Sequence, residues 1–241
     1  MADKFTAIIS NYAPRGNLGV NNLINQLIDV VDRIIIVIND DSCAFLHKEI
    51  SNEIIQITRP NTGMNIGAWS EAIEYVSDSD YTIFLQDECR LLRADFIDNY
   101  KNLLSQPNIG MIGESVNPKW DCEWLEISNS RLNYLINFSN GQSISRVSYY
   151  LECMKKWNIN PGIRSTHLRS LVWAFNKKGI DAIDHFPIGL NKEECIAAEI
   201  AVSRKLIQKG LEFRQSDSSS FTYFEHHEWQ KDGFSKKQTR F

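Results

Sequence analysis

One stretch decides how this chain can fold: Tyr81-Thr82-Ile83-Phe84-Leu85-Gln86-Asp87-Glu88-Cys89-Arg90. Its apolar first half is typical of a buried strand in a parallel sheet. The two acids that follow would lie at the carboxyl edge of that sheet, where open α/β sheets bind ligands. Two carboxylates held there could bind a hard divalent cation that bridges phosphate oxygens. The alternative is a solvated strand end, and only the rest of the chain can separate the two.

Composition favours a cytoplasmic protein with a sizeable core. A chain of 241 residues can bury such a core without disulfides. Its five cysteines contain no CxxC pair, which argues against a zinc ribbon and against a secreted disulfide framework. The net charge of -4, with acids and bases mixed, implies no broad basic face for nucleic acid. The N-terminus resembles neither a signal peptide nor a membrane span, so we expect a soluble protein.

Strand and helix patterns alternate on both sides of the opening stretch. Residues 5–10, 34–38, 53–58, 109–113, 171–175 and 221–224 are predicted strands. Helices are predicted around residues 23–31 and over 68–76, 94–105, 143–157, 178–185 and 191–210. The last helix has Ile196, Ile200, Ser203 and Ile207 along one side and a natural stop at Gly210. Such alternation predicts βαβ units and a parallel, doubly wound sheet in the first half of the chain.

Short polar residues follow the first two strands. Ser10 and Asn11 come after the first strand and could hold a nucleobase or ribose at the sheet edge. Asp40 and Asp41 follow the second strand and could accept hydrogen bonds from a base N–H or a ribose hydroxyl. A helix N-cap or an Asx-turn is the alternative for the two acids.

A glycine-bearing loop, residues 59–67, opens the next predicted helix. Gly63 and Gly67 would let the backbone approach a ligand closely, and the helix N-terminus favours anions, so Arg59 and Asn61 become candidates for phosphate binding. The spacing is not a dinucleotide fingerprint, and the glycines could serve turn geometry alone.

The order of these motifs resembles the GT-A nucleotide-sugar glycosyltransferases, closest to the large family often numbered two, over roughly Phe5 to Phe213. It consists of the acids after the second strand, the Arg59-x-Asn61-x-Gly63-x-x-x-Gly67-Ala68 loop, Gln86-Asp87-Glu88, and a late helix-borne acid. The resemblance implies an α/β fold of GT-A (Rossmann-like) type, with a mostly parallel sheet flanked by helices. A single domain would span residues 1–230, with a nucleotide-binding half over about 1–113 and an acceptor-side half over about 114–230.

Gln86-Asp87-Glu88 occupies the place of that family's D-x-D metal motif, with a neutral amide at the first acid. The resemblance implies that Glu88 is a metal ligand for manganese or magnesium, with Asp87 second. His226 or His227 would supply a third ligand. Adjacent strand residues point to opposite faces, so we expect at most one of the two to serve. The alternative is a pair of ordinary surface histidines.

Glu199 stands where the resembling family has its catalytic acid, and it would take a proton from the acceptor hydroxyl. Glu193 and Glu194 are the alternative catalytic acids if the register differs. The structural alternative is that Glu199 lies on a solvent-exposed helix face. His167 and Arg169 precede a strand, where they could contact an acceptor or phosphate or simply belong to a loop.

We therefore predict a glycosyltransferase that moves a sugar, with inversion, from a nucleotide-diphosphate donor to a hydroxyl of a glycan or lipid-linked acceptor, in cell-surface polysaccharide synthesis. UDP is the favoured nucleotide, and GDP or dTDP are possible. The tail, residues 231–241, is basic and could contact the inner face of the membrane or be loose. One alternative is a sugar-phosphate nucleotidyltransferase, although Pro14-Arg15-Gly16-Asn17-Leu18-Gly19 only loosely imitates its loop. Another is an inactive GT-A fold that binds a glycan or a partner, which Gln86 favours.

Overall fold

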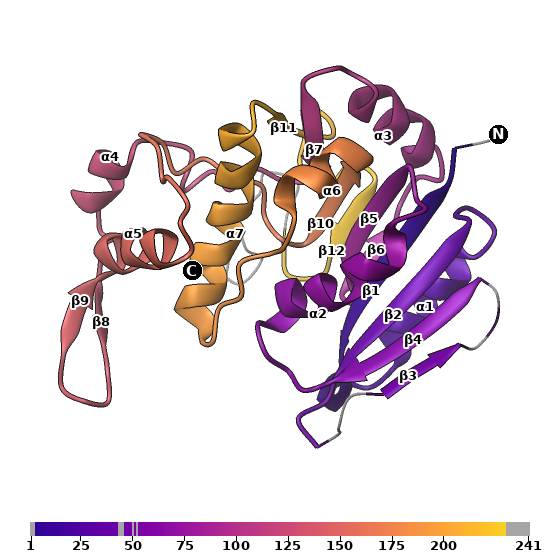
Figure 1. Ribbon diagram of the computed structural model, residues 1–241, viewed down its shortest axis with the longest axis horizontal. Coiled ribbons are helices and arrows are strands. Elements are labelled where there is room, and N and C mark those ends of the chain that lie inside the picture. The colour runs from indigo at the N-terminus through magenta and orange to yellow at the C-terminus, as the bar shows by residue number, and fades with distance from the viewer. Residues whose placement is uncertain (1–2, 43–45, 50, 52, 230–241) are drawn as a thin grey trace.

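The opening stretch forms β5 (Tyr81–Gln86), near the centre of an eight-stranded sheet (Figure 1). The structure is a computed structural model that describes residues 3–42, 46–49, 51 and 53–229, with the backbone only for 46–49. The sheet order is β11-β7-β10-β5-β1-β2-β4-β3. Its other strands are β1 (Phe5–Tyr12), β2 (Arg33–Asn39), β3 (Leu46–Glu49), β4 (Ile54–Arg59), β7 (Ile109–Gly113), β10 (Val172–Asn176) and β11 (Glu212–Gln215).

The sheet is mostly parallel. β1 pairs in parallel with β2 and β5, and β2 pairs in parallel with β4. β10 lies between β5 and β7 and is antiparallel to both, while β3 is antiparallel to β4 at the edge. Because β10 and β11 come from the second half of the chain, both halves share one sheet, and the carboxyl ends of β1, β2 and β5 meet at one edge.

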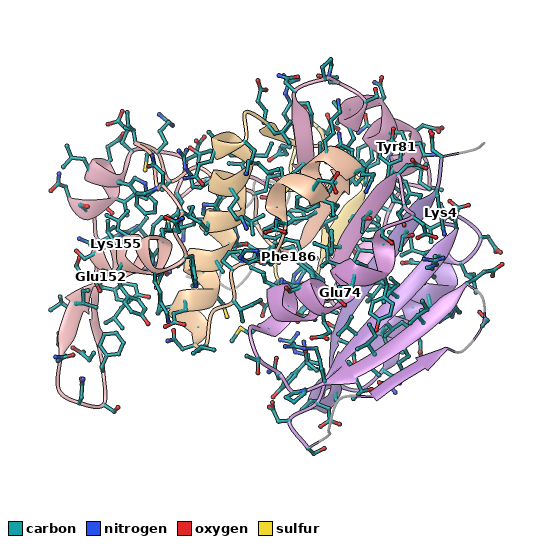
Figure 2. All side chains as sticks on the ribbon, viewed as in Figure 1. Lys4, Glu74, Tyr81, Glu152, Lys155 and Phe186 are labelled. Atoms are coloured by element: carbon teal, nitrogen blue, oxygen red, sulfur yellow. The ribbon has the colours of Figure 1, made fainter. Side chains whose placement is uncertain are left out.

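Alternating side chains bury both faces of the sheet. On one face Ile8 and Phe84 pack with α2 (Met64–Ala72), α6 (Lys177–Ile183) and α7 (Lys192–Gln208). On the other face Ile9 and Leu85 pack with α1 (Leu18–Leu27) and α3 (Phe96–Leu104). Phe186, labelled near the centre of Figure 2, packs edge-on against Phe84. Burial on both faces explains why these strands read as continuous apolar runs.

A smaller lobe stands beside the sheet (Figure 1). It contains α4 (Trp124–Ser128), the hairpin of β8 (Leu135–Asn137) and β9 (Ser143–Ser145), and α5 (Arg146–Lys156). Its core of aromatic and aliphatic side chains packs on α7. Helix α7 therefore has apolar neighbours on two sides, with Ala198 and Val202 toward the sheet and Ala197 and Ala201 toward the lobe.

Several predicted boundaries need correction. The stripe expected on α7 is confirmed at Ile200 and Ser203, which are fully buried, and is wrong at Ile207, which is 40% exposed. Residues 143–145 form β9, and the helix predicted from residue 143 begins at Arg146. The strand predicted over residues 221–224 begins later, as β12 (Phe224–His226), and pairs with β6 (Cys89–Leu91). Phe221 cannot be part of it, because its left-handed φ of 58° is not an extended conformation.

The predicted C-terminal tail, residues 231–241, lies outside the described residues, and its membrane contact stays a prediction. Within the part of the chain that is described, the structure has no helix with the length and apolarity needed to cross a membrane.

Candidate active site

A cleft of about 340 Å³ lies at the carboxyl edge of β1, β2 and β5, where the strand pattern predicted a ligand. Of the predicted nucleotide-binding residues, Ser10, Asn11, Asn61, Gln86 and Asp87 line it. The rest of its lining is Tyr12, Arg15, Asn39, Met64, Asn65 and Glu88. The cleft is thus rich in amide and carboxylate groups, which can hydrogen-bond a base and a ribose.

Asp40 and Asp41 are not among the residues that line the cleft. Asp40 Oδ1 accepts hydrogen bonds from the N–H and the hydroxyl of Ser42, at 2.9 and 2.6 Å. Asp41 Oδ1 accepts from Asn61 N–H at 3.0 Å. The first contact is the Asx-turn that the sequence allowed as an alternative, and the second fixes the loop that carries Asn61.

Arg59 and Gly67 also serve the loop geometry. Arg59 is buried, and its guanidinium donates to Asn39 Oδ1 at 2.8 Å and to the Thr62 carbonyl at 2.9 Å. A Cβ on Gly67 would come within 1.9 Å of the Thr62 carbonyl oxygen, so only glycine fits there. These two residues line a shallow hollow away from the cleft, and they support the loop that presents Asn61 and Asn65.

Gln86 and Asp87 join the end of β5 to its neighbours. Gln86 Nε2 donates to the Ser170 carbonyl at 2.7 Å. Asp87 is buried, and its Oδ2 accepts from Asn11 Nδ2 at 2.8 Å and from Tyr12 N–H at 3.4 Å. Burial raises the pKa of Asp87, and these two hydrogen bonds oppose the shift. Both side chains therefore hold the cleft in shape.

Glu88, His226 and His227 converge at one end of the cleft. Glu88 Oε2 lies 3.7 Å from His226 Nε2, and Oε1 lies 3.4 Å from His227 Nδ1. One ligand atom from each of the three residues falls within 4.8 Å of the others, as a shared metal ion would require. The two histidines do not point to opposite faces, as the sequence analysis assumed, because β12 ends at His226 and the chain turns there, so that the two rings stack.

The donor set of this cluster suits a transition metal. One carboxylate and two imidazoles fit manganese better than magnesium, which prefers oxygen ligands alone. Two contacts compete with an ion. Arg15 Nη1 lies 2.5 Å from Glu88 Oε2 and neutralises it. His226 Nδ1 accepts from Glu228 N–H at 3.2 Å, so the neutral ring carries its proton on Nε2, toward Glu88. Metal binding through Nε2 would require the other tautomer.

A larger cavity of about 700 Å³ adjoins the same carboxylates. It shares Arg15, Asp87 and Glu88 with the cleft, and His227 faces it as well. The polar side of α1 forms another part of its wall, through Asn22, Asn25 and Gln26. Glu88 therefore stands between two open spaces, and a ligand at Glu88 can extend into either.

Buried Glu114 positions the segment that brings in the histidines. Its Oε1 accepts from the hydroxyls of Tyr100 and Ser216 at 2.5 and 2.6 Å. Its Oε2 accepts from the N–H groups of Tyr223 and Phe224 at 2.9 and 3.2 Å. Since β12 begins at Phe224, this carboxylate anchors the strand that ends in His226.

Glu199 lies on α7, and its side chain is 14% exposed. It accepts a hydrogen bond from Ser170 N–H. The carbonyl of the same Ser170 accepts from Gln86 Nε2 at 2.7 Å and from Asn65 Nδ2 at 2.6 Å, and both of these side chains line the cleft. Ser170 therefore links the predicted catalytic acid to the predicted donor cleft, and Glu199 is not on a solvated helix face.

Glu199 faces a separate cavity of about 430 Å³. The cavity is lined by Asn117, Lys119, Trp120, Leu132, Arg146, Arg169, Ser170, Leu171, Ile196, Glu199 and Trp229. His167 is fully buried behind it, with Nε2 3.9 Å from Glu199 Oε2, and burial lowers the pKa of His167. His167 Nδ1 donates to the Ser165 carbonyl at 2.8 Å, which leaves the lone pair on Nε2. His167 and Arg169 do lie in the loop before β10, as the sequence analysis allowed, and both are buried there.

The alternative acids on α7 have other partners. Glu193 accepts from the hydroxyls of Tyr134 and Tyr150 at 2.8 and 2.5 Å. Glu194 Oε2 accepts from Leu190 N–H at 2.7 Å at the start of the helix. Neither residue lines the cavity that Glu199 faces, so Glu199 is the better candidate.

Sequence reasoning missed Arg15, Asn39, Asn65 and Ser170 as site residues. Asn39 ends β2 at the ligand edge, and that position was a usable signal. Asn65 and Ser170 meet through a hydrogen bond between residues that are 105 positions apart. No local sequence pattern predicts a contact between residues so far apart in the chain. Arg15 was noted only as part of a loose nucleotidyltransferase motif, yet it lines both the cleft and the larger cavity.

Comparisons with known proteins support the fold. A scan against protein-family models and a search of curated proteins both find no match. Among solved structures, a mannosyltransferase from Pyrobaculum calidifontis, in complex with GDP-Man and Mn2+, matches at 11% identity with a TM-score of 0.50. That match covers 89% of this chain, which spans only 55% of the mannosyltransferase.

Glucosyl-3-phosphoglycerate synthase from Mycobacterium tuberculosis, in complex with Mn2+, UDP and glucosyl-3-phosphoglycerate, matches at 11% identity and a TM-score of 0.50, over 96% of this chain and 74% of that one. A protein described as a glucose-1-phosphate thymidylyltransferase from Bacillus anthracis matches at 11% identity and a TM-score of 0.47, over 92% and 89%. Likeness at such identities shows the fold alone. The chain has the GT-A fold, a mostly parallel Rossmann-like sheet flanked by helices, as predicted.

Proposed function

We propose that this protein is a glycosyltransferase that moves a sugar from a nucleotide-diphosphate donor to an acceptor hydroxyl. One observation carries the proposal. The peptide of Ser170 connects the cleft at the sheet edge to the carboxylate of Glu199, which faces a second cavity. A transferase with two substrates needs this arrangement, because donor and acceptor must approach each other beside a proton acceptor.

The donor nucleotide would occupy the cleft. Ser10, Asn11, Asn39 and Asn61 offer hydrogen-bonding groups for a base and ribose. The diphosphate would lie toward Glu88, where Arg15 supplies a positive charge. UDP is the first donor to test, followed by GDP and dTDP. The roles of Asp40, Asp41, Arg59 and Gly67 are then indirect, through the loops that they hold.

The metal ion would be held by Glu88, His226 and His227, with Asp87 fixing the backbone next to them. A bound divalent ion, manganese in preference to magnesium, offsets the negative charge that develops on a departing diphosphate. Binding at Glu88 would release the half-exposed Arg15 from its ion pair. Arg15 would then be available to the phosphate oxygens.

Glu199 would act as the base. Its carboxylate takes the proton of the acceptor hydroxyl as that oxygen forms a bond to the anomeric carbon, while the bond from that carbon to the diphosphate oxygen breaks. Attack from the side opposite the leaving group inverts the anomeric centre. The hydrogen bond from Ser170 N–H holds the carboxylate in place and leaves its second oxygen available to the acceptor.

The wider role follows the resemblance. We propose a glycan or lipid-linked acceptor, cell-surface polysaccharide synthesis and a cytoplasmic location, with the tail at the inner face of the membrane. Thermal unfolding with UDP, GDP and dTDP, each with and without Mn²⁺, tests donor binding. At a ligand concentration of about 100 Kd, linkage gives about 2.7 kcal/mol of stabilisation. If none of the three nucleotides stabilises the protein, the transferase proposal fails.

A sugar-phosphate nucleotidyltransferase remains a second candidate, because Arg15 lies in the loop after β1 and lines the cleft, as a triphosphate-binding residue would. Such an enzyme binds nucleoside triphosphates and releases pyrophosphate. Pyrophosphate release from UTP, CTP or dTTP with a sugar 1-phosphate would support it. Nucleotide binding without any turnover would favour the inactive fold. Gln86 does not itself argue for inactivity, since its amide is used to hold Ser170.

A further inference from the structure

The cavity that faces Glu199 carries an excess of positive charge. Of the residues that the structure describes, three cationic side chains line it, those of Lys119, Arg146 and Arg169, and one acidic side chain, that of Glu199. Arg146 is already matched, because its Nε lies 3.2 Å from Glu193 Oε2 outside the cavity lining. Such a lining attracts an acceptor with a negative group more strongly than a neutral one.

Arg169 is a buried residue whose hydrogen-bond donors are not all used by the described part of the chain. It is 5% exposed, and Nη2 donates to Asn117 Oδ1 at 3.2 Å. Among the described residues its Nε has no hydrogen-bond partner. Burial lowers the pKa of Arg169 to about 10, and the nearby Glu199 opposes that shift. A buried guanidinium with an unused donor is costly unless a ligand completes its hydrogen bonds.

Aromatic side chains hold this guanidinium and shape the cavity. The Cζ atom of Arg169 lies 3.7 Å from the centroid of the Trp229 ring. Trp120 lies on the same cavity and stacks on Tyr150, with ring centroids 5.4 Å apart. Stacking on Trp229 fixes the plane of the guanidinium, and a fixed plane suits bidentate recognition of a carboxylate or phosphate. The aromatic rings supply flat apolar surface for the rest of a ligand.

We propose that the acceptor is an anionic saccharide, in which a carboxylate or phosphate group is bound by Arg169 while a neighbouring hydroxyl faces Glu199. This inference rests on the proposed transferase function. Lys119 adds to the positive potential of the cavity. The volume of about 430 Å³ is within the range of small-ligand pockets. An acceptor without the negative group would bind more weakly, since the charge of Arg169 would stay buried beside an unused donor.

Three sugars that differ only at carbon 6 test the proposal: glucose, glucuronate and glucose 6-phosphate. Binding to the unmodified chain is followed through the indole N–H signals of its six tryptophans, two of which, Trp120 and Trp229, line the cavity. We expect glucuronate, glucose 6-phosphate or both to shift these two signals, with a Kd at least about tenfold below that of glucose. The sugar that binds identifies the carboxylate or the phosphate. Equal binding of all three sugars, or equally tight binding of inorganic phosphate alone, would overturn the proposal.

Arg169→Met, compared with the surface control Arg164→Met, assigns the effect to one guanidinium. Arg164 is about half exposed and pairs with Asp121. The Arg169 variant should lose the preference for the charged sugar, and the control should keep it. If Arg169→Met fails to fold, the comparison of the three sugars on the unmodified protein still decides. Donor binding is measured separately with UDP. Sugar selectivity without nucleotide binding would remove the transferase function alone, and nucleotide binding without sugar selectivity would remove this inference alone.

Discussion

Replacing Glu114 separates the two kinds of hydrogen bond that it accepts. In Glu114→Gln, the amide oxygen can keep the backbone N–H groups of Tyr223 and Phe224, while the amide nitrogen turns toward the hydroxyls of Tyr100 and Ser216. Those hydroxyls can rotate and accept. The loss is then mainly the charge on four hydrogen bonds, about 0.5–1 kcal/mol each, or about 2–4 kcal/mol in total.

In Glu114→Leu the four hydrogen-bond donors have no acceptor, and the two backbone N–H groups cannot rotate toward another one. At about 1–3 kcal/mol for each unsatisfied buried group, two backbone donors and two hydroxyls cost about 4–12 kcal/mol. That is comparable to the whole stability of a typical domain. Tyr100→Phe is the matched control, since it removes one donor and leaves three.

Urea unfolding followed by circular dichroism measures these differences. We expect Tyr100→Phe to cost least, Glu114→Gln more, and Glu114→Leu to prevent folding or nearly so. For the Gln variant the loss corresponds to about 4–16 °C in Tm for a chain of this size. Because Glu114 anchors β12, the folded Gln variant should also bind Mn²⁺ more weakly. Equal stabilities for the Gln and Leu variants would refute the hydrogen-bond account.

Three further predictions concern the site itself. Glu88→Gln removes the only carboxylate of the three-residue cluster, so Mn²⁺ affinity should fall about tenfold or more in calorimetry, and unchanged affinity would place the ion elsewhere. Glu199→Gln should keep UDP binding and lower turnover about 10²–10⁴-fold, because the amide oxygen can still accept from Ser170 N–H but cannot take a proton. Normal turnover would show that Glu199 is not the catalytic base. Burial holds the pKa of His167 below its ordinary value of 6.5. Between the folded and unfolded pKa values the unfolded chain binds more protons than the folded one, so the free energy of unfolding rises with pH. His167→Gln should flatten this rise in unfolding measured from about pH 5 to about pH 7, and an unchanged slope would contradict the assignment.

The strands of the fold were predictable because their signal is local. Residues 34–38 and 81–85 carry apolar side chains on both faces, and in the structure these strands are buried on both sides of the sheet. The short strands β6 and β11 were missed, since three or four residues of mixed polarity carry no periodicity. The stripe predicted on α7 was incomplete for another reason, since it left out the small residues that also make contacts. A helix packed on two sides needs small residues such as Ala197 and Ala201, which do not form an amphipathic stripe.

The site was predictable at the strand ends and not beyond them. Ser10 and Gln86 could be placed because strands in parallel bring their carboxyl ends to one edge. The pairing of Glu88 with His227 depends on β12 meeting β6, a contact across more than half of the chain. Arg59 was predicted to bind phosphate because of its charge, whereas its guanidinium donates to Asn39 and to the Thr62 carbonyl and lies 3.6 Å from Glu71.

In the proposed function, the nucleotide diphosphate binds in the cleft at the ends of β1, β2 and β5, next to a metal ion at Glu88. A crystal structure of the protein with UDP and Mn²⁺, with anomalous scattering recorded at the manganese edge, measures this directly. We expect one anomalous peak about 2.0–2.3 Å from Glu88 and at least one of His226 and His227, with the base and ribose beside Ser10 and Asn11. A nucleotide outside the cleft, or a peak that none of these three residues contacts, would contradict it.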